Sequence, residues 1–196
     1  MSTRESILDA VRRNQPAAVA LPEVPLFDTD ASPLWERFTF ALQRMGGKLA
    51  ELLPGSDLNR FIRELFPTAE VICSATPEVV GNKPIGDVRE PRDLDDVDVG
   101  VVRAAFGVAE TGSVFLSERE LVVNALAYLA QHLVVLLDPD EIIGNLHQAY
   151  RRPEFREVRY GVLMTGPSAT ADIEGVLIHG AQGVRTLTLI PLPRLR

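Results

Sequence analysis

The sequence predicts an α/β domain with a largely parallel sheet that helices cover on both faces. Two observations support this prediction. Segments with apolar residues at helical spacing alternate along the chain with short, continuous apolar runs. The run His132–Leu137 is apolar after its first residue, which is typical of a strand buried on both faces. Alternating helices and strands generally form parallel sheets with helices on both sides.

The composition is that of a globular protein and excludes several classes. Hydrophobic residues make up 46% of the 196 residues and charged residues 24%, so a sizeable core is expected. The net charge of −7 argues against a nucleic-acid-binding protein, which usually has a basic surface. No apolar run approaches the ~18 residues of a membrane-spanning helix, and the first residues do not resemble a secretory signal. We therefore expect a cytoplasmic protein that binds neither nucleic acid nor membrane.

The residues that commonly bind metals are few and scattered. Cys73 is the only cysteine and lies in an apolar run, so it is expected to be buried. A single thiolate can hold neither an iron–sulfur cluster nor a structural zinc ion. His132, His147 and His179 lack metal-ligand spacing, so no metal site is predicted. The common nucleotide and cofactor motifs are also missing, which leaves the cofactor unknown.

The N-terminal part differs from the rest of the chain. A helix beginning at Ser2 or Thr3 is expected first, and it ends in two basic residues. Residues 14–33 contain four prolines without a sustained period, which is typical of a linker or arm. We therefore expect a helix and arm over residues 1–33 and a single α/β domain over residues 34–196.

Within residues 34–196 the pattern predicts the following elements. Helices are expected over Leu34–Met45, Asp57–Phe66, Leu121–Leu129 and from Asp138 to Tyr150; strands over Lys48–Leu52, Glu70–Ser74, Val97–Phe106, Ser113–Leu116, His132–Leu137, Val158–Thr165 and Arg185–Pro191. The segment Ala75–Asp95 is rich in proline, glycine and acidic residues and is expected to be irregular.

Two polar loops follow predicted strands, and parallel sheets bind ligands at the carboxyl ends of their strands. The first loop is Ala109–Ser113. Thr111, Ser113 and free backbone N–H groups can hold an anion there, and Gly112 allows a close approach. Glu110 is the titratable group of this loop. The alternative is a hairpin or bulge with a solvated acid.

The second loop is Thr165–Glu174. Apolar residues return at helical spacing from Ile173, so a helix is expected to follow. The hydroxyls would then surround a helix N-terminus, which favours anions. Simple capping of that helix is the alternative. The candidate ligand-binding residues of this loop are Thr165, Gly166, Pro167, Ser168 and Thr170.

Acidic residues and one histidine complete the candidate site. Glu110 and Asp172 are candidates for orienting the ligand or moving a proton. Asp172 and Glu174 diverge on a helix, so Asp172 is expected to point inward and Glu174 toward solvent. His132 opens a buried strand and can face the site, although a structural role is the alternative.

The two loops resemble a known family. The segments GVAETGSV and MTGPSATADIEGVLIHGAQG resemble the paired signatures of the LutC/YkgG lactate-utilisation family, the LUD domain. The resemblance extends from about Leu34 onward. Where the family usually has a histidine and a proline, in GVHGP, this chain has Gln182 and Val184. A role for a histidine at that place is therefore not expected here.

The resemblance implies a fold similar to that of the phosphosugar isomerase and CoA-transferase superfamily (NagB/RpiA/CoA transferase-like), with a Rossmann-like sheet. It also implies an accessory subunit beside iron–sulfur partner subunits that oxidise L-lactate to pyruvate. The single cysteine agrees with a cluster carried by a partner. Two alternatives stay open: an acyl- or CoA-transferase-like or nucleotide-dependent enzyme, with Glu110 as a carboxylate nucleophile in the transferase, or a non-catalytic assembly or regulatory protein.

Overall fold

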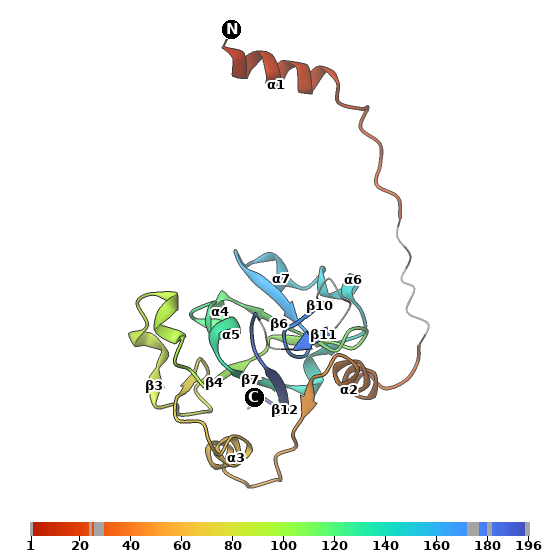
Figure 1. Ribbon diagram of the computed structural model, residues 1–196. Coiled ribbons are helices and arrows are strands. Elements are labelled where there is room, and N and C mark those ends of the chain that lie inside the picture. Colours follow the sequence, from red (N-terminus) through yellow and green to blue (C-terminus); the bar gives the residue numbers. More distant parts are fainter. Residues whose placement is uncertain (1, 24, 26–29, 172–176, 180–181, 195–196) are drawn as a thin grey trace.

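The computed structural model describes residues 2–23, 25, 30–171, 177–179 and 182–194 (Figure 1). The helices are α1 (Thr3–Arg13), α2 (Leu34–Arg44), α3 (Leu58–Leu65), α4 (Glu118–Leu121), α5 (Leu126–Leu129), α6 (Leu146–Ala149) and α7 (Pro153–Arg156), with 3-10 helices at Ile85–Asp87, Pro91–Leu94 and Pro139–Glu141. The strands are β1 (Lys48–Leu49), β2 (Ile72–Ser74), β3 (Lys83–Pro84), β4 (Val99–Arg103), β5 (Phe106–Val108), β6 (Ser113–Ser117), β7 (His132–Leu137), β8 (Ile142–Ile143), β9 (Gly161–Met164), β10 (Ala169–Ala171), β11 (Leu177–His179) and β12 (Thr186–Pro191).

The largest sheet is parallel throughout, which confirms the predicted fold class. Its strand order is β1-β12-β7-β4-β2-β3. Its central strand β7 has the predicted bounds. Val134 and Leu136 face one core cluster, which α3 covers through Ile62, whereas Leu133 and Val135 face the cluster that includes α5. Both faces are apolar because helices cover both, and the strand is therefore a continuous apolar run.

A second, mixed sheet has the order β8-β5-β6-β9. The predicted single strand over Val97–Phe106 is wrong, because β4 ends at Arg103 and β5 begins at Phe106 in this other sheet. Strands β5 and β6 are antiparallel and form a hairpin. In the core beneath them the rings of Phe106 and Phe115 stack with centroids 4.8 Å apart. The consecutive strands β4 and β5 therefore belong to different sheets.

Two predicted helices differ in the structure. The helix predicted over Leu121–Leu129 is shortened to α5, because α4 ends at Leu121 and Val122 has a φ of +59° that no α-helix accommodates. The helix from Asp138 to Tyr150 is reduced to a 3-10 turn, strand β8 and α6. Ile142 pairs with Gly107 of β5 and is buried, so contacts between strands override the helical spacing.

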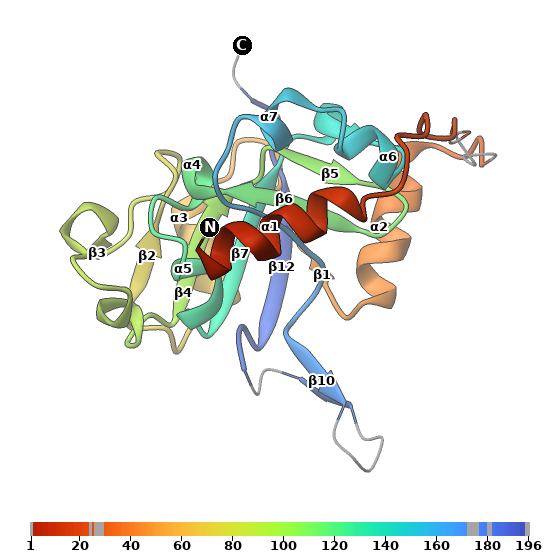
Figure 2. The same ribbon diagram turned by 90° about the horizontal axis from the view of Figure 1, so that it is seen from above.

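The helix predicted after the second loop is also absent at its described positions. β10 and β11 form an antiparallel hairpin with Ala169 opposite His179. Figure 2 shows this hairpin extending from the body of the domain. Asp172 and Glu174 lie outside the described residues.

The N-terminal helix begins as predicted. Ser2 caps α1, and its capping box with Glu5 is complete. No side chain of α1 is buried, and Figure 1 shows this helix apart from the sheets. In the described part of the chain no helix is both long and apolar enough to cross a membrane.

Candidate functional site

The two candidate loops lie side by side. β6 and β9 are antiparallel, with Val114 opposite Met164, and this register places Ser113 next to Thr165. The hydroxyl groups of Ser113 and Thr165 are hydrogen-bonded, and Thr111 Oγ1 lies 2.7 Å from Ser113 Oγ. Three hydroxyls, two from the first loop and one from the second, thus form a continuous chain.

The reason for this proximity differs from the prediction. Neither loop follows a strand of the parallel sheet; both follow strands of the mixed sheet. The first loop is a hairpin turn between β5 and β6, in which the Gly112 N–H donates to the Val108 carbonyl over 2.9 Å. The hairpin alternative is therefore right about the backbone.

The end of α2 packs against both loops. Gly112 and Gly166 each have a φ of +65°, a region that favours glycine. A Cβ on Gly112 would lie 2.1 Å from the backbone nitrogen of Leu42, and one on Gly166 would lie 2.1 Å from the carbonyl oxygen of Met45. Both glycines are therefore required for the loops to dock against the α2 backbone. In the described part of the chain the second loop leads into β10 and not into a helix, so no helix dipole among these residues supports anion binding there.

A pocket of about 650 Å³ opens between α2 and the loops. We call it the loop pocket. It is lined by Asp30, Arg37, Phe40, Ala41, Arg44 and Met45 and by Ala109, Glu110, Thr111, Ser113 and Thr165. Sequence reasoning identified the loop residues but missed the two arginines of α2. Their seven-residue spacing, which places them on one helix face, was the available signal.

The charged side chains of the loop pocket differ in the partners that they have. Arg37 pairs with Asp30 at 3.4 Å. The carboxylate of Glu110 accepts a hydrogen bond from the backbone N–H of Leu146 at 3.0 Å, which ties the turn to α6. Arg44 is exposed and lies over the Phe40 ring, 5.7 Å from its centroid. No described carboxylate pairs with Arg44, so this guanidinium group is the cation most accessible to an anion.

A smaller pocket of about 290 Å³ lies beside the first residues of the second loop. Gly166, Pro167 and Ser168 form one side of it, and Gln182 forms part of the other. The Ser168 N–H donates to the carbonyl of Val184 over 2.9 Å, so the two replaced family positions lie beside this loop. Thr165 borders both pockets. Thr170 lies in β10 opposite Ile178 and lines neither pocket.

His132 lies at the amino-terminal end of β7 and is not among the residues that line the loop pocket. Its Nδ1 atom is 2.8 Å from Thr186 Oγ1, and its ring is 4.9 Å from the Phe66 ring. Burial lowers the pKa of His132, and the charges of Arg185 and Lys48 lower it further against the opposing effect of Asp98. These contacts are those of a structural histidine.

Cys73 is fully buried in the core, as predicted. Burial raises the pKa of its thiol above the ordinary value, which keeps the thiol protonated and unreactive. Among the described residues, no three His, Cys, Asp or Glu side chains are placed to hold a metal ion.

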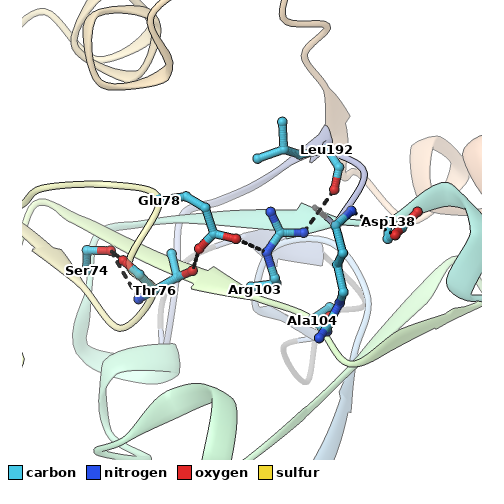
Figure 3. A network of polar contacts seen from close by, with 8 residues as sticks. Ser74, Thr76, Glu78, Arg103, Ala104, Asp138 and Leu192 are labelled. Carbon is cyan, nitrogen blue, oxygen red and sulfur yellow. Dashed lines mark hydrogen bonds and ion pairs between the residues drawn. The ribbon is translucent and has the colours of Figure 1, made fainter. Parts of the chain in front are cut away.

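A second polar cluster occupies the carboxyl ends of the parallel strands (Figure 3). Glu78 and Arg103 form an ion pair whose side chains are 32% and 11% exposed. The Thr76 hydroxyl donates to the other oxygen of Glu78. Arg103 Nη1 donates to the carbonyl of Leu192 over 2.9 Å. Glu78 and Arg103 are 25 residues apart in the chain, so no local pattern connects them.

The Glu78 carboxyl is expected to make stability depend on pH. Burial raises its pKa, but hydrogen bonds from Thr76 and from its own backbone, with the charge of Arg103, lower the pKa overall. A lowered folded pKa stabilises the protein above the ordinary value of 4.5, and this contribution is lost as pH falls through the folded pKa. Glu78→Gln should therefore lower the free energy of unfolding by about 1 kcal/mol at pH 7 and by less at pH 3.

Urea denaturation at both pH values measures this difference. Glu64→Gln, which changes an exposed carboxylate paired with Arg60, serves as the control and should alter stability by less than about 0.5 kcal/mol at pH 7. An equal loss for Glu78→Gln at both pH values would contradict the role given to its charge.

Comparison with known proteins agrees with the predicted resemblance. The family model of the LUD domain matches residues 88–190, slightly more than half of the chain. Lactate utilization protein C of Deinococcus radiodurans is 29% identical over 101 residues, which are 50% of this chain and 48% of that protein. The match therefore spans about half the length of this relative.

A solved structure shares the fold. The crystal structure of a DUF162 family protein from Deinococcus radiodurans aligns with a TM-score of 0.63 and 17% identity, covering 85% of this chain and 99% of that chain. At this identity the likeness shows the fold alone. The family model matches slightly more than half of this chain, and the two signature loops meet at the end of α2. This chain therefore belongs to the LUD-domain family.

Proposed function

We propose that this protein takes part in lactate utilisation, as an accessory subunit of an L-lactate-oxidising iron–sulfur system, and binds a small anionic ligand or cofactor in the loop pocket. The name of the Deinococcus relative supports the pathway. One structural observation supports the site: the hydroxyl chain Thr111–Ser113–Thr165 lines the same pocket as Arg44. Hydroxyl donors beside a cation suit a carboxylate.

The proposed role of each residue follows from the chemistry of its side chain. Arg44 would supply the positive charge, and the hydroxyls would donate to the carboxylate oxygens. Glu110 would orient the ligand, since it is one of the residues that line the pocket. Oxidation of lactate releases two electrons, and an iron–sulfur cluster that accepts electrons needs several thiolates. Because the chain has one cysteine and this cysteine is buried, we assign the cluster to partner subunits.

The carboxylate of Glu110 is less suited to act as the nucleophile of a transferase. One of its oxygens already accepts a hydrogen bond from Leu146, and this bond holds the carboxylate against α6. The accessory role therefore fits the geometry better than the transferase alternative.

Calorimetric titration of L-lactate and pyruvate into the purified protein tests the proposed site. The wild-type protein should bind at least one of them, and Arg44→Gln should weaken the affinity about tenfold or more, because a charge-assisted hydrogen bond contributes about 1.5–3 kcal/mol. Thr165→Val should weaken it by a smaller factor. Arg63→Gln removes an exposed arginine of α3 and should leave the affinity unchanged.

Two results would count against the site: no binding of either acid by the wild-type protein, or equal affinity for Arg44→Gln and Arg63→Gln. The role in the pathway is tested separately. Affinity purification from cells oxidising lactate should recover iron-containing partner proteins with this chain, and recovery of the chain without them would contradict the accessory role.

A further inference from the structure

The parallel sheet has a topological switch point that the proposed function does not use. From β2 the chain passes to β3 on one side, and it then returns to β4 and continues through β7 to β12 on the other side. The switch therefore lies between β2 and β4. In open α/β sheets, ligands bind outside the carboxyl ends of the strands at such a point.

A pocket of about 710 Å³ lies at this place, and we call it the switch-point pocket. Residues Ala75 to Glu78 follow β2, Arg103 ends β4, and Leu192 to Arg194 follow β12. Arg119 and Glu120 of α4 complete the lining. Its volume is in the range of typical small-molecule sites.

The acidic groups of the switch-point pocket are already engaged. One oxygen of Glu78 bonds to Arg103 and the other to Thr76. Glu120 Oε2 accepts hydrogen bonds from the backbone N–H and the hydroxyl of Ser117, at 2.8 and 2.6 Å. These carboxylates therefore have little capacity left to bind a cationic ligand.

The guanidinium of Arg103 is engaged only in part. Its Nε donates to Glu78 and its Nη1 to the carbonyl of Leu192, whereas no described residue accepts a hydrogen bond from Nη2 (Figure 3). The Arg103 side chain is only 11% exposed, and the protein fixes its orientation through Nε and Nη1. The third donor atom, Nη2, remains available to a ligand. A partly buried, oriented arginine is well suited to a carboxylate or phosphate group.

We propose that the switch-point pocket binds an organic oxyanion, a carboxylate or a phosphate on an apolar body, with Arg103 Nη2 donating to the anionic oxygen. Arg119 and Arg194 add positive charge at the rim, and Pro77, Leu192 and Pro193 provide apolar walls. Glu78 is a positioning residue, because it holds the guanidinium in place.

This site is separate from the loop pocket. Ser113, which lines the loop pocket, begins β6, and Arg119, which lines the switch-point pocket, follows its end. A five-residue strand at about 3.3 Å per residue keeps the two ends well apart. The inference therefore does not depend on lactate binding.

Phenyl phosphate and benzoate, with benzamide as the neutral analogue, are suitable probes. In a calorimetric titration the wild-type protein should bind phenyl phosphate or benzoate at least about tenfold more tightly than benzamide. Arg103→Met should weaken binding of the anions about tenfold or more without changing benzamide binding. Glu78→Gln keeps an oxygen that can accept the hydrogen bond from Arg103 Nε, so the guanidinium stays in place, and it removes a negative charge beside the anion. This variant should therefore not weaken anion binding, and Arg63→Gln should change nothing.

If Arg103→Met fails to fold, Arg103→Lys is the second variant. It keeps a cation beside Glu78 but removes the forked N–H donors of the guanidinium, so it should still weaken anion binding. Whichever of phenyl phosphate and benzoate binds more tightly shows whether the pocket prefers a phosphate or a carboxylate. The proposal is overturned if neither anion binds more tightly than benzamide, or if the folded Arg103 variants bind the anions like the wild-type protein.

Discussion

Replacing Gly112 by alanine is expected to lower the free energy of unfolding by about 3 kcal/mol. A positive φ costs an L-residue about 1–2 kcal/mol, and overpacking adds about 1–3 kcal/mol. The contact is with backbone, since the new Cβ would lie 2.1 Å from the nitrogen of Leu42 and 2.6 Å from the carbonyl carbon of Ala41. The first loop would have to move away from α2, so lactate binding at the loop pocket should also be lost.

Gly55→Ala is the matched control for this prediction. Gly55 has a φ of +80°, but a Cβ there would meet nothing within 4 Å. Its replacement should therefore cost only the backbone term, about 1 kcal/mol. Chemical denaturation of both variants gives the comparison, and equal losses would show that the close approach of the loop to α2 is unimportant.

Phe38→Ala is expected to destabilise the domain by about 3–5 kcal/mol, the usual range for a fully buried phenylalanine. Phe38 is 0% exposed and stacks on Trp35 with ring centroids 6.1 Å apart. Its ring also contacts the mixed sheet, because a Cβ on Gly107 would lie 3.0 Å from Phe38 Cε2. The side chain therefore anchors α2, and with it Arg44, against the strands that carry the first loop.

Phe40→Ala provides the control on the same helix. Phe40 is 64% exposed and lines the loop pocket, so its removal should change stability by less than about 1 kcal/mol. Thermal and urea unfolding distinguish the two variants. A loss for Phe40→Ala as large as that for Phe38→Ala would contradict the assignment of Phe38 as the anchor of α2.

Elements whose apolar pattern matches their burial could be predicted from the sequence. Strand β7 is buried on both faces, and α2 buries Phe38 and Leu42 on one face. The pattern failed for the segment from Asp138 to Tyr150, where Ile142 is apolar because it pairs with β5 and not because it belongs to a helix. Which sheet a strand joins depends on partners far along the chain, and local periodicity does not report them.

The candidate site, like the fold, could be predicted only in part from the sequence. The polar residues of both signature loops were named, and the hydroxyls of Thr111, Ser113 and Thr165 lie together, whereas Ser168 and Thr170 lie outside the loop pocket. Arg44 was missed, because it approaches the loop pocket only through the packing of α2 against distant strands. The parallel sheet was predicted, but the assignment of the two loops to its carboxyl ends was wrong. Those ends carry Arg103 and the residues after β2 instead.

The most direct test of the loop pocket is a titration of the ¹⁵N-labelled protein with L-lactate, followed by ¹H–¹⁵N NMR after backbone assignment. The largest amide shift changes are expected at Glu110–Ser113 and at Thr165 and Gly166, with smaller changes at the end of α2. Amides of Ala75–Glu78 and Arg103 should stay unchanged. Saturating lactate without shifts in either loop, or with shifts confined to the switch-point pocket, would contradict the claim that the two signature loops bind the ligand.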